Sequence, residues 1–527
     1  MSVVALLRVG ICRFGCLAIL GLCSGSGGLP RPSEAAGPDH AVAGEMARLI
    51  DDALQESWRR QGQAPASTAP PATLLRRVSL DLIGRIPTVS ETRSFLADAS
   101  PQRFTKRVGQ LLRSPAHARH LATVLRRSWI PAADTPQFAH LVEPYEAWLT
   151  RRLKQGACYD ELVREQLTVP VCEQAVPVDS DQPTLGSPAF LAAADVNPAR
   201  LAANTTRAFL GLNLDCAQCH DHPFSRWRRE EFWQVAAFFS HPAPSTSGQV
   251  EPWTIEIEET GRVVRATYPE GEPLEVPRSR DAQAGPEALA RWITAEKNPY
   301  FARNAVNRLW ATCFGSGLVE PLDDLSGAEP SPQNALLNAL AARFARDGYR
   351  LQPLVEGMVR SRAYRASARA SAPRETPPPS ASLPFHKMPV RALTGEQLHA
   401  SLLTAAGMDP TSVEPQDRQA FVARFFIDRP TEAERSLSQA LVLMNGELTN
   451  ELTNPQQSPL LITLQTAPFL GLDEKIELLF LASYTRHPTP VEVVETEAYV
   501  RTHPDPSQAW ANVFWAFLNS TEFNTNH

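Results

Sequence analysis

Apolar residues recur every three to four positions along most of this chain, which is the spacing of an amphipathic helix. In residues 41–60, Met46, Ile50, Leu54 and Trp58 fall on one helical face. The same spacing predicts helices over 74–82, 104–112, 117–129, 145–153, 159–167, 198–212, 229–240, 286–294, 301–314, 333–346, 353–362, 394–406, 437–443, 475–484 and 508–518. Ser90 is expected to cap one further helix that runs through Phe95. We therefore predict a mainly α fold.

Two short segments break the helical pattern. Apolar and polar residues alternate over 254–258 and again over 262–266, with Gly261 between them, which predicts a small β-hairpin. We expect a hairpin and linker over 242–285 to join two helical domains, an N-terminal one over 40–241 and a C-terminal one over 286–527. Residues 367–385 are rich in Pro and Ser and predict a loop inside the second domain.

The most informative chemistry lies at Cys216-Ala217-Gln218-Cys219-His220. This C-x-x-C-H pattern is typical of covalent attachment of a c-type haem. On a helix, positions i and i+3 share a face, so Cys216 and Cys219 would form two thioethers to one porphyrin edge. His220 would be the proximal ligand of the haem iron. No distal ligand is identified, although His386 and Met388 are the most interesting candidates. The other candidates are Met358, Met444, His241 and His399.

Two other interpretations use the same residues. Cys216, Cys219 and either His220 or His222 are also suitable zinc ligands, with a fourth ligand from elsewhere. Alternatively, the two cysteines form a disulfide or are purely structural. The aromatic residues that follow the motif either wall a porphyrin or form the domain core; they are Phe224, Trp227, Phe232, Trp233, Phe238 and Phe239.

Composition and the N-terminus bear on location and partners. The 527 residues carry a net charge of −6, which predicts no nucleic-acid partner. Arg8 and Arg13, the apolar run over 14–23 and the small residue Ala35 indicate a signal peptide over 1–35 and hence a periplasmic or secreted protein. No later segment has 18 uninterrupted apolar residues, so we expect no membrane span in the mature chain. Cys158 and Cys172 are expected to pair in an oxidising compartment.

Common catalytic motifs are missing from the sequence. It contains no G-x-S-x-G, H-E-x-x-H, P-loop or dinucleotide fingerprint, so no catalytic residue is assigned. The carboxylate pairs Asp51-Asp52 and Asp323-Asp324 are of a kind common on surfaces. Asn307 and Arg308 are interpreted as a polar tie between helices.

Several longer motifs resemble a pair of planctomycete-type, cytochrome-c-associated families of unassigned function. The chain is similar to the N-terminal family, a planctomycete cytochrome-c-like domain, and to the C-terminal family, a planctomycete-specific domain. The resemblance rests on residues 75–88, 159–167, 209–239, 298–310, 315–321, 444–448 and 515–523. It implies an association with cytochrome c chemistry but no particular reaction.

These observations support one leading hypothesis and two others. The leading hypothesis is an exported protein with one covalent haem that serves electron transfer or a redox complex with an unidentified protein partner. The main alternative is a non-redox extracytoplasmic scaffold or interaction protein, with a structural zinc or disulfide at the same motif. A third is an enzyme acting on extracellular polymer, with its site in a cleft between the two halves.

Overall fold

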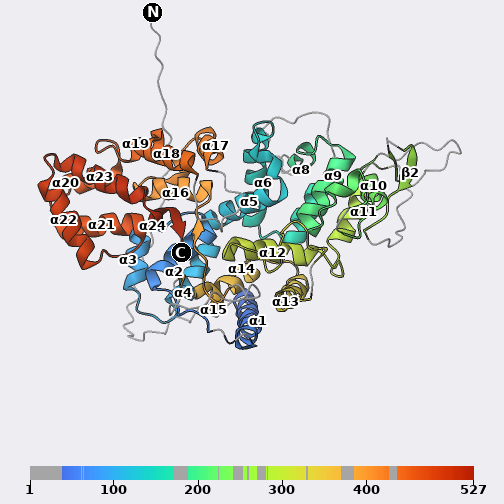
Figure 1. Cartoon of the computed structure of the whole chain (residues 1–527), viewed down its shortest axis with the longest axis horizontal. Coiled ribbons are helices and arrows are strands. Elements are labelled where there is room, and N and C mark those ends of the chain that lie inside the picture. Colours follow the sequence, from blue (N-terminus) through green and yellow to red (C-terminus); the bar gives the residue numbers. More distant parts are fainter. Residues whose placement is uncertain are drawn as a thin grey trace, which may run out of the picture. The chain divides into compact units, whose positions relative to one another are not determined.

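Helices make up most of the regular structure, as the apolar spacing predicts, so the mainly α fold is confirmed (Figure 1). The computed structural model describes residues 38–527 apart from 61, 63, 170–187, 223–224, 241–252, 258–259, 270–280, 282, 328–329, 369–384 and 426–435. Residues 38–527 cluster into one compact unit. The predicted signal peptide, most of the 367–385 loop, Cys172 and His241 lie outside the described residues.

The helices of the first half are α1 (Pro38–Arg60), α2 (Pro71–Ile83), α3 (Val89–Ala97), α4 (Arg103–Leu112), α5 (Pro115–Trp129), α6 (Val142–Lys154), α7 (Tyr159–Leu167), α8 (Ala189–Ala192), α9 (Pro198–Thr205) and α10 (Arg229–Ala236). Short 3₁₀ or π turns lie among them: η1 (Pro131–Asp134), η2 (Ala139–Leu141), η3 (Thr206–Leu210), η4 (Asp215–Gln218) and η5 (Ala237–Phe239).

The second half continues with α11 (Ala284–Ile293), α12 (Phe301–Phe314), α13 (Pro332–Arg346), α14 (Leu351–Arg360), α15 (Arg362–Arg365), α16 (Gly395–Ala405), η6 (Pro410–Ser412), α17 (Pro415–Arg424), α18 (Leu437–Asn445), α19 (Glu447–Leu452), α20 (Pro459–Thr466), α21 (Leu472–Tyr484), α22 (Pro490–Thr502), α23 (Pro506–Leu518) and α24 (Thr521–Asn524). Helices α21, α22 and α23 lie side by side (Figure 1). None of the helices in the described ranges is long and apolar enough to cross a membrane.

The few strands in the described ranges form two antiparallel pairs. β1 (Thr254–Ile257) pairs with β2 (Arg262–Arg265), and Gly261 supplies the left-handed turn residue with φ +64°. The predicted hairpin is thus confirmed. β3 (Arg391–Ala392) pairs with β4 (Thr525–Asn526), a pairing that the sequence pattern did not indicate.

The apolar core consists of two clusters, and α2 contributes to both. Leu75 and Val78 belong to the larger cluster, which draws on residues from 46 to 388, whereas Leu80 belongs to the cluster formed mainly by residues 393–523. Every residue of α2 from Leu74 to Ile83 is buried, so this helix has no solvent face. The division of the chain into domains at 242–285 stays a prediction.

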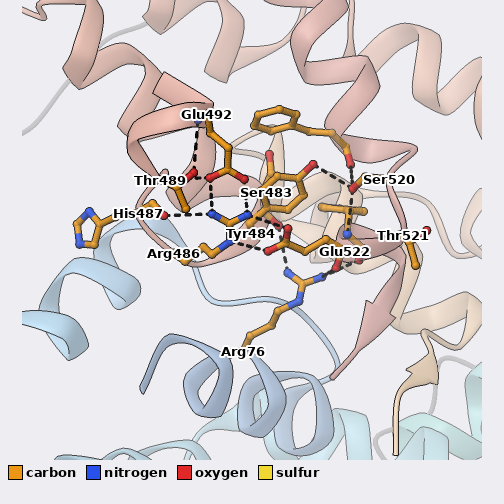
Figure 2. Close-up of polar contacts among 12 residues, drawn as sticks. Arg76, Ser483, Tyr484, Arg486, His487, Thr489, Glu492, Ser520, Thr521 and Glu522 are labelled. Carbon is orange, nitrogen blue, oxygen red and sulfur yellow. Dashed lines mark hydrogen bonds and ion pairs between the residues drawn. The ribbon is translucent and has the colours of Figure 1, made fainter. Parts of the chain in front are cut away.

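Arg76 on α2 is buried and connects the helix to the last part of the chain. Its guanidinium donates to the backbone oxygens of Ser483, at 3.1 Å, and Phe523, at 2.6 Å (Figure 2). Beside it, Arg486 binds the carboxylates of Glu492 and Glu522, each through two nitrogen atoms (Figure 2). The hydrogen bonds from Arg486 lower the pKa of Glu492 to about 2. Charge-assisted contacts therefore fix α21, α22 and α24 around α2.

One helix start differs from its prediction. Thr88, not Ser90, caps α3: its hydroxyl accepts from the Glu91 backbone N–H, while the Glu91 carboxylate accepts from the Thr88 N–H at 2.8 Å. This reciprocal capping box satisfies two backbone donors at once, which a cap at Ser90 would not do.

Candidate functional site

A helix and a tight turn lead the chain into the C-x-x-C-H segment. Asn197 caps α9 by accepting from the backbone N–H groups of Ala199 and Arg200, and Pro198 takes the first helical position. The helix widens into the π turn η3, and Gly211 ends it in the left-handed region with φ +63°. The helix that we expected over 198–212 is therefore present but stops at Leu210.

The motif itself begins on the 3₁₀ turn η4 rather than on an α-helix. Cys216 lies within this turn, and Cys219 is the residue that directly follows it. Both residues are exposed and both thiols are free. The two sulfurs are thus accessible from solvent, which is a requirement for modification of the folded chain.

His220 is also exposed, and its ring has one nitrogen occupied. Nδ1 lies 2.8 Å from the backbone oxygen of Asp221. An N–H on Nδ1 donates there, which leaves the Nε2 lone pair available for a metal, as in most metal-binding histidines. His222 is half-buried, and its backbone N–H donates to the Trp227 oxygen at 2.8 Å. Within the described ranges, no three His, Cys, Asp or Glu side chains are arranged to hold a metal ion.

Most of the aromatic residues after the motif belong to the core. Trp227, Phe232 and Phe238 are buried, while Trp233 is half-buried and donates from Nε1 to the Gln218 backbone oxygen at 3.0 Å. Phe224 lies outside the described residues. The attachment residues therefore fit a c-type haem, but these three rings are already packed and do not form an open porphyrin wall.

The candidate distal ligands are dispersed. Met358 and Met388 are buried in the larger apolar cluster, and His386 is half-buried. His399 is buried and its ring contacts Phe421. The distal ligand thus stays unassigned.

The turn before the motif is held by α12. Asn304 donates from Nδ2 to the Ala208 oxygen at 2.7 Å, and Arg308 donates to the Arg207 oxygen at 2.9 Å. Arg207 in turn pairs with Asp215, directly before Cys216, at 2.9 Å. The predicted polar tie at Arg308 is confirmed, and it positions the segment that carries the thiols.

A buried set of charges centred on Arg126 was not identified from the sequence. The Arg126 guanidinium contacts the carboxylates of Asp134, Glu146 (3.2 Å) and Glu396 (3.6 Å). Burial disfavours the charge on Arg126, but the three carboxylates outweigh it and raise its pKa. Residues from α5, η1, α6 and α16 are joined in this way.

A second buried set is centred on Asp81. Its two carboxylate oxygens accept from Arg391 at 3.0 and 2.9 Å, from the Tyr364 hydroxyl at 2.7 Å and from the Asn526 amide at 2.9 Å. One Arg391 nitrogen, Nη2, donates to both oxygens, and the charge of Asp81 raises the pKa of Arg391 although the group is buried. No local pattern in the sequence indicates this set, since its members are 283 to 445 residues apart from Asp81.

Comparison with known families agrees with the motifs. Residues 49–243 match PSCyt2, described as a protein of unknown function (DUF1549), and residues 286–422 match PSD1, described as a protein of unknown function (DUF1553). The motifs at 444–448 and 515–523 lie beyond the matched ranges. Neither the curated proteins nor the solved structures include a match. The chain thus belongs to the proteins in which a PSCyt2 domain precedes a PSD1 domain.

Proposed function

We propose that this chain is an exported protein that binds one c-type haem covalently and serves electron transfer or a redox complex. The observation that carries the proposal is the motif turn: Cys216, Cys219 and His220 are all exposed, and both thiols are free. The contact from His220 Nδ1 to the Asp221 oxygen orients the ring with Nε2 available. The name of the matched N-terminal family, PSCyt2, supports the same association.

Attachment requires only groups that the turn presents. Each cysteine S–H adds across one vinyl group of the porphyrin, with sulfur bonding to one carbon and hydrogen to the other, so no oxidant is consumed. His220 would hold the iron from one side. When bound, haem supplies one-electron transfer, and an exposed attachment turn would place it close to a docked redox protein.

Export belongs to the same proposal because c-type haem is attached outside the cytoplasm. The predicted signal peptide over 1–35 would be removed after Ala35. N-terminal sequencing of the exported protein tests this part, and an uncleaved N-terminus would contradict it.

The haem is tested by producing the full chain in a bacterial host that has a c-type haem maturation system. We expect a haem-dependent peroxidase stain that survives denaturing electrophoresis, together with the intact mass of one added haem. The Cys216→Ser/Cys219→Ser double variant should lose both signals. The matched control Cys158→Ser, which removes a cysteine outside the motif, should keep them. An unstained wild-type chain of apoprotein mass would refute the proposal.

The buried state of Trp227, Phe232 and Phe238 favours a second candidate, a non-redox scaffold or interaction protein. In that protein Cys216 and Cys219, with His220 or His222, would hold zinc or form a disulfide. Metal analysis and peptide mass mapping of the same preparation distinguish the two. One zinc per chain, or a Cys216–Cys219 disulfide found by peptide mass mapping in a chain without haem, would support the scaffold.

A further inference from the structure

A cavity of about 390 Å³ lies where α5, α12, α16 and the β3–β4 pair meet. This volume falls in the range of small-molecule sites. The cavity is lined by polar groups such as His120, Ser128, Arg308, Arg391 and Asn526, together with apolar side chains. Asp323, which is exposed, also lines it, so the cavity reaches the surface there. None of the motif residues lines it.

Several polar atoms of the lining have no hydrogen-bond partner. Asn526 is only 3% exposed and donates to Asp81, but its Oδ1 accepts from no group in the described chain. The Arg391 Nε, the Ser128 hydroxyl and the His120 Nε2 are likewise buried without a partner there. Buried polar atoms are nearly always satisfied, so these atoms are available to bond with water or with a small molecule that enters the cavity.

These atoms include both donors and acceptors. Burial lowers the pKa of His120 to about 4, so the ring is neutral, and its hydrogen bond to the Asp81 backbone leaves Nε2 as an acceptor. Asn526 Oδ1 is a second acceptor, whereas Arg391 Nε donates. The Ser128 hydroxyl does either.

The charges of the lining are largely balanced by the protein itself. Arg391 is paired with Asp81, and Glu396 is paired with Arg127 at 3.2 Å. Arg308, which forms no ion pair within the described residues, is offset electrostatically by Asp323. The lone pairs of His120 and Asn526 would repel an anionic ligand, and the charges of Arg308 and Arg391 would repel a cationic one. The lining therefore favours a neutral ligand.

We infer that this cavity binds a neutral, hydroxyl-rich small molecule, a sugar of one or two rings. A sugar hydroxyl both donates and accepts, so one ligand satisfies the donors and the acceptors of the lining together. Trp129 and Leu309, which also line the cavity, offer apolar contact to the C–H groups of a sugar ring. The inference does not depend on the haem proposal, because Cys216, Cys219 and His220 do not line the cavity. Arg207 and Arg308 line it and also hold the motif turn.

The test uses the full exported chain and ligand-observed NMR, with D-glucose, D-xylose and cellobiose as neutral probes. D-Glucuronate and D-glucosamine are the charged control probes, since each resembles glucose in size and shape but carries a negative or a positive charge. We expect at least one neutral sugar to show saturation transfer at millimolar concentration and both charged sugars to bind about tenfold more weakly or not at all. Tighter binding of a charged sugar, or no transfer to any neutral one, would overturn the inference.

Two variants locate the binding. Ala311 lines the cavity and is half-buried, so Ala311→Phe should fill the space without removing a polar contact, and should abolish saturation transfer. Ala498→Phe places the same ring on an exposed position of α22 and should leave binding unchanged. Should Ala311→Phe fail to fold, Ser128→Ala removes a hydroxyl that no group in the described part of the chain uses and should weaken binding about three- to tenfold. Unchanged binding in both cavity variants would show that the sugar binds elsewhere.

Discussion

His220 and His120 mark two regions of very different character. His220 stands beside two free thiols on an exposed turn, where few neighbours constrain it. His120 lies among the buried charges of α5, α2 and α16, and burial lowers its pKa to about 4. The first region has groups ready for a cofactor but contributes little to packing, whereas the second holds the helices together.

The difference shows that the residues proposed to bind a cofactor and the buried charges that stabilise the fold lie in different regions of the chain. Asn304, Arg308 and Arg207 position the thiol turn through hydrogen bonds to the residues that precede the two cysteines. The cysteine side chains take no part in these contacts and are free to react. The Asp81 carboxylate, in contrast, accepts hydrogen bonds from Arg391, Tyr364 and Asn526 within the fold. Four measurements can break or sharpen this comparison.

The largest effect is expected for Asp81→Ala. The change leaves Arg391 buried without a counter-ion, which typically costs about 3–5 kcal/mol. Urea unfolding followed by circular dichroism measures the loss. Asp52→Ala, at an exposed carboxylate, should change the free energy of unfolding by less than about 0.5 kcal/mol. If Asp81→Ala and Asp52→Ala lower the free energy of unfolding equally, the buried charges do not contribute more to stability than the exposed ones.

The free energy of unfolding should depend on pH in a way that reflects the titration of His120. Its pKa is lowered from 6.5 to about 4 in the folded protein, chiefly by burial and also by nearby His117. Because the unfolded chain takes up the proton first, the contribution is complete above pH 6.5 and is lost as the pH falls to about 4.

Unfolding of His120→Gln, followed in urea across this pH window, should show a shallower loss than wild type, by up to about 3 kcal/mol. The exposed His140→Gln variant serves as the control and should keep the wild-type slope. If the free energy of unfolding of His120→Gln falls with pH as steeply as that of the wild type, His120 is not the group responsible for the loss of stability.

Asn304→Leu should affect both regions at a moderate level. It leaves the buried Ala208 oxygen without its 2.7 Å donor and Arg308 without one acceptor, a loss of about 1–3 kcal/mol. Hydrogen exchange should also become faster over residues 206–220. Asn445→Leu, at an exposed position, is the control and should change neither quantity. Unchanged exchange at the motif would mean that α12 does not position it.

The smallest effect on stability is expected for the Cys216→Ser/Cys219→Ser double variant of the apoprotein. Both thiols are exposed and free, so the free energy of unfolding should change by less than about 0.5 kcal/mol. Cys313→Ser, which places a hydroxyl in the core, should cost about 1–3 kcal/mol in the same assay. A large loss in the double variant would give the motif a structural role.

Local patterns predicted much of this fold. The helix at Pro198, the hairpin around Gly261 and the amphipathic helices follow from spacing and turn residues. The Thr88 cap was also within reach, because Glu91 follows it by three residues. Helix α22 was missed because Val491 and Val494 are exposed and obscure the apolar spacing.

The candidate sites were only half predictable. Covalent attachment needs particular residues at fixed spacing, so Cys216, Cys219 and His220 were evident in the sequence. The 3₁₀ form of their turn was not, since it depends on Gly211 and on contacts with α12. The cavity was not predicted, because lining residues such as His120, Arg308 and Asn526 become neighbours only through tertiary folding.

The bond between Asp81 and Asn526 also has a consequence for biosynthesis. The two residues are 445 positions apart, and a ribosome adds about 5–20 residues per second, so Asp81 and Arg76 wait about 20–90 s for their last partners. During that interval α2 has its charges uncovered beside apolar surface meant for the core. Helix α2 therefore completes its hydrogen bonds only once the last residues of the chain are available.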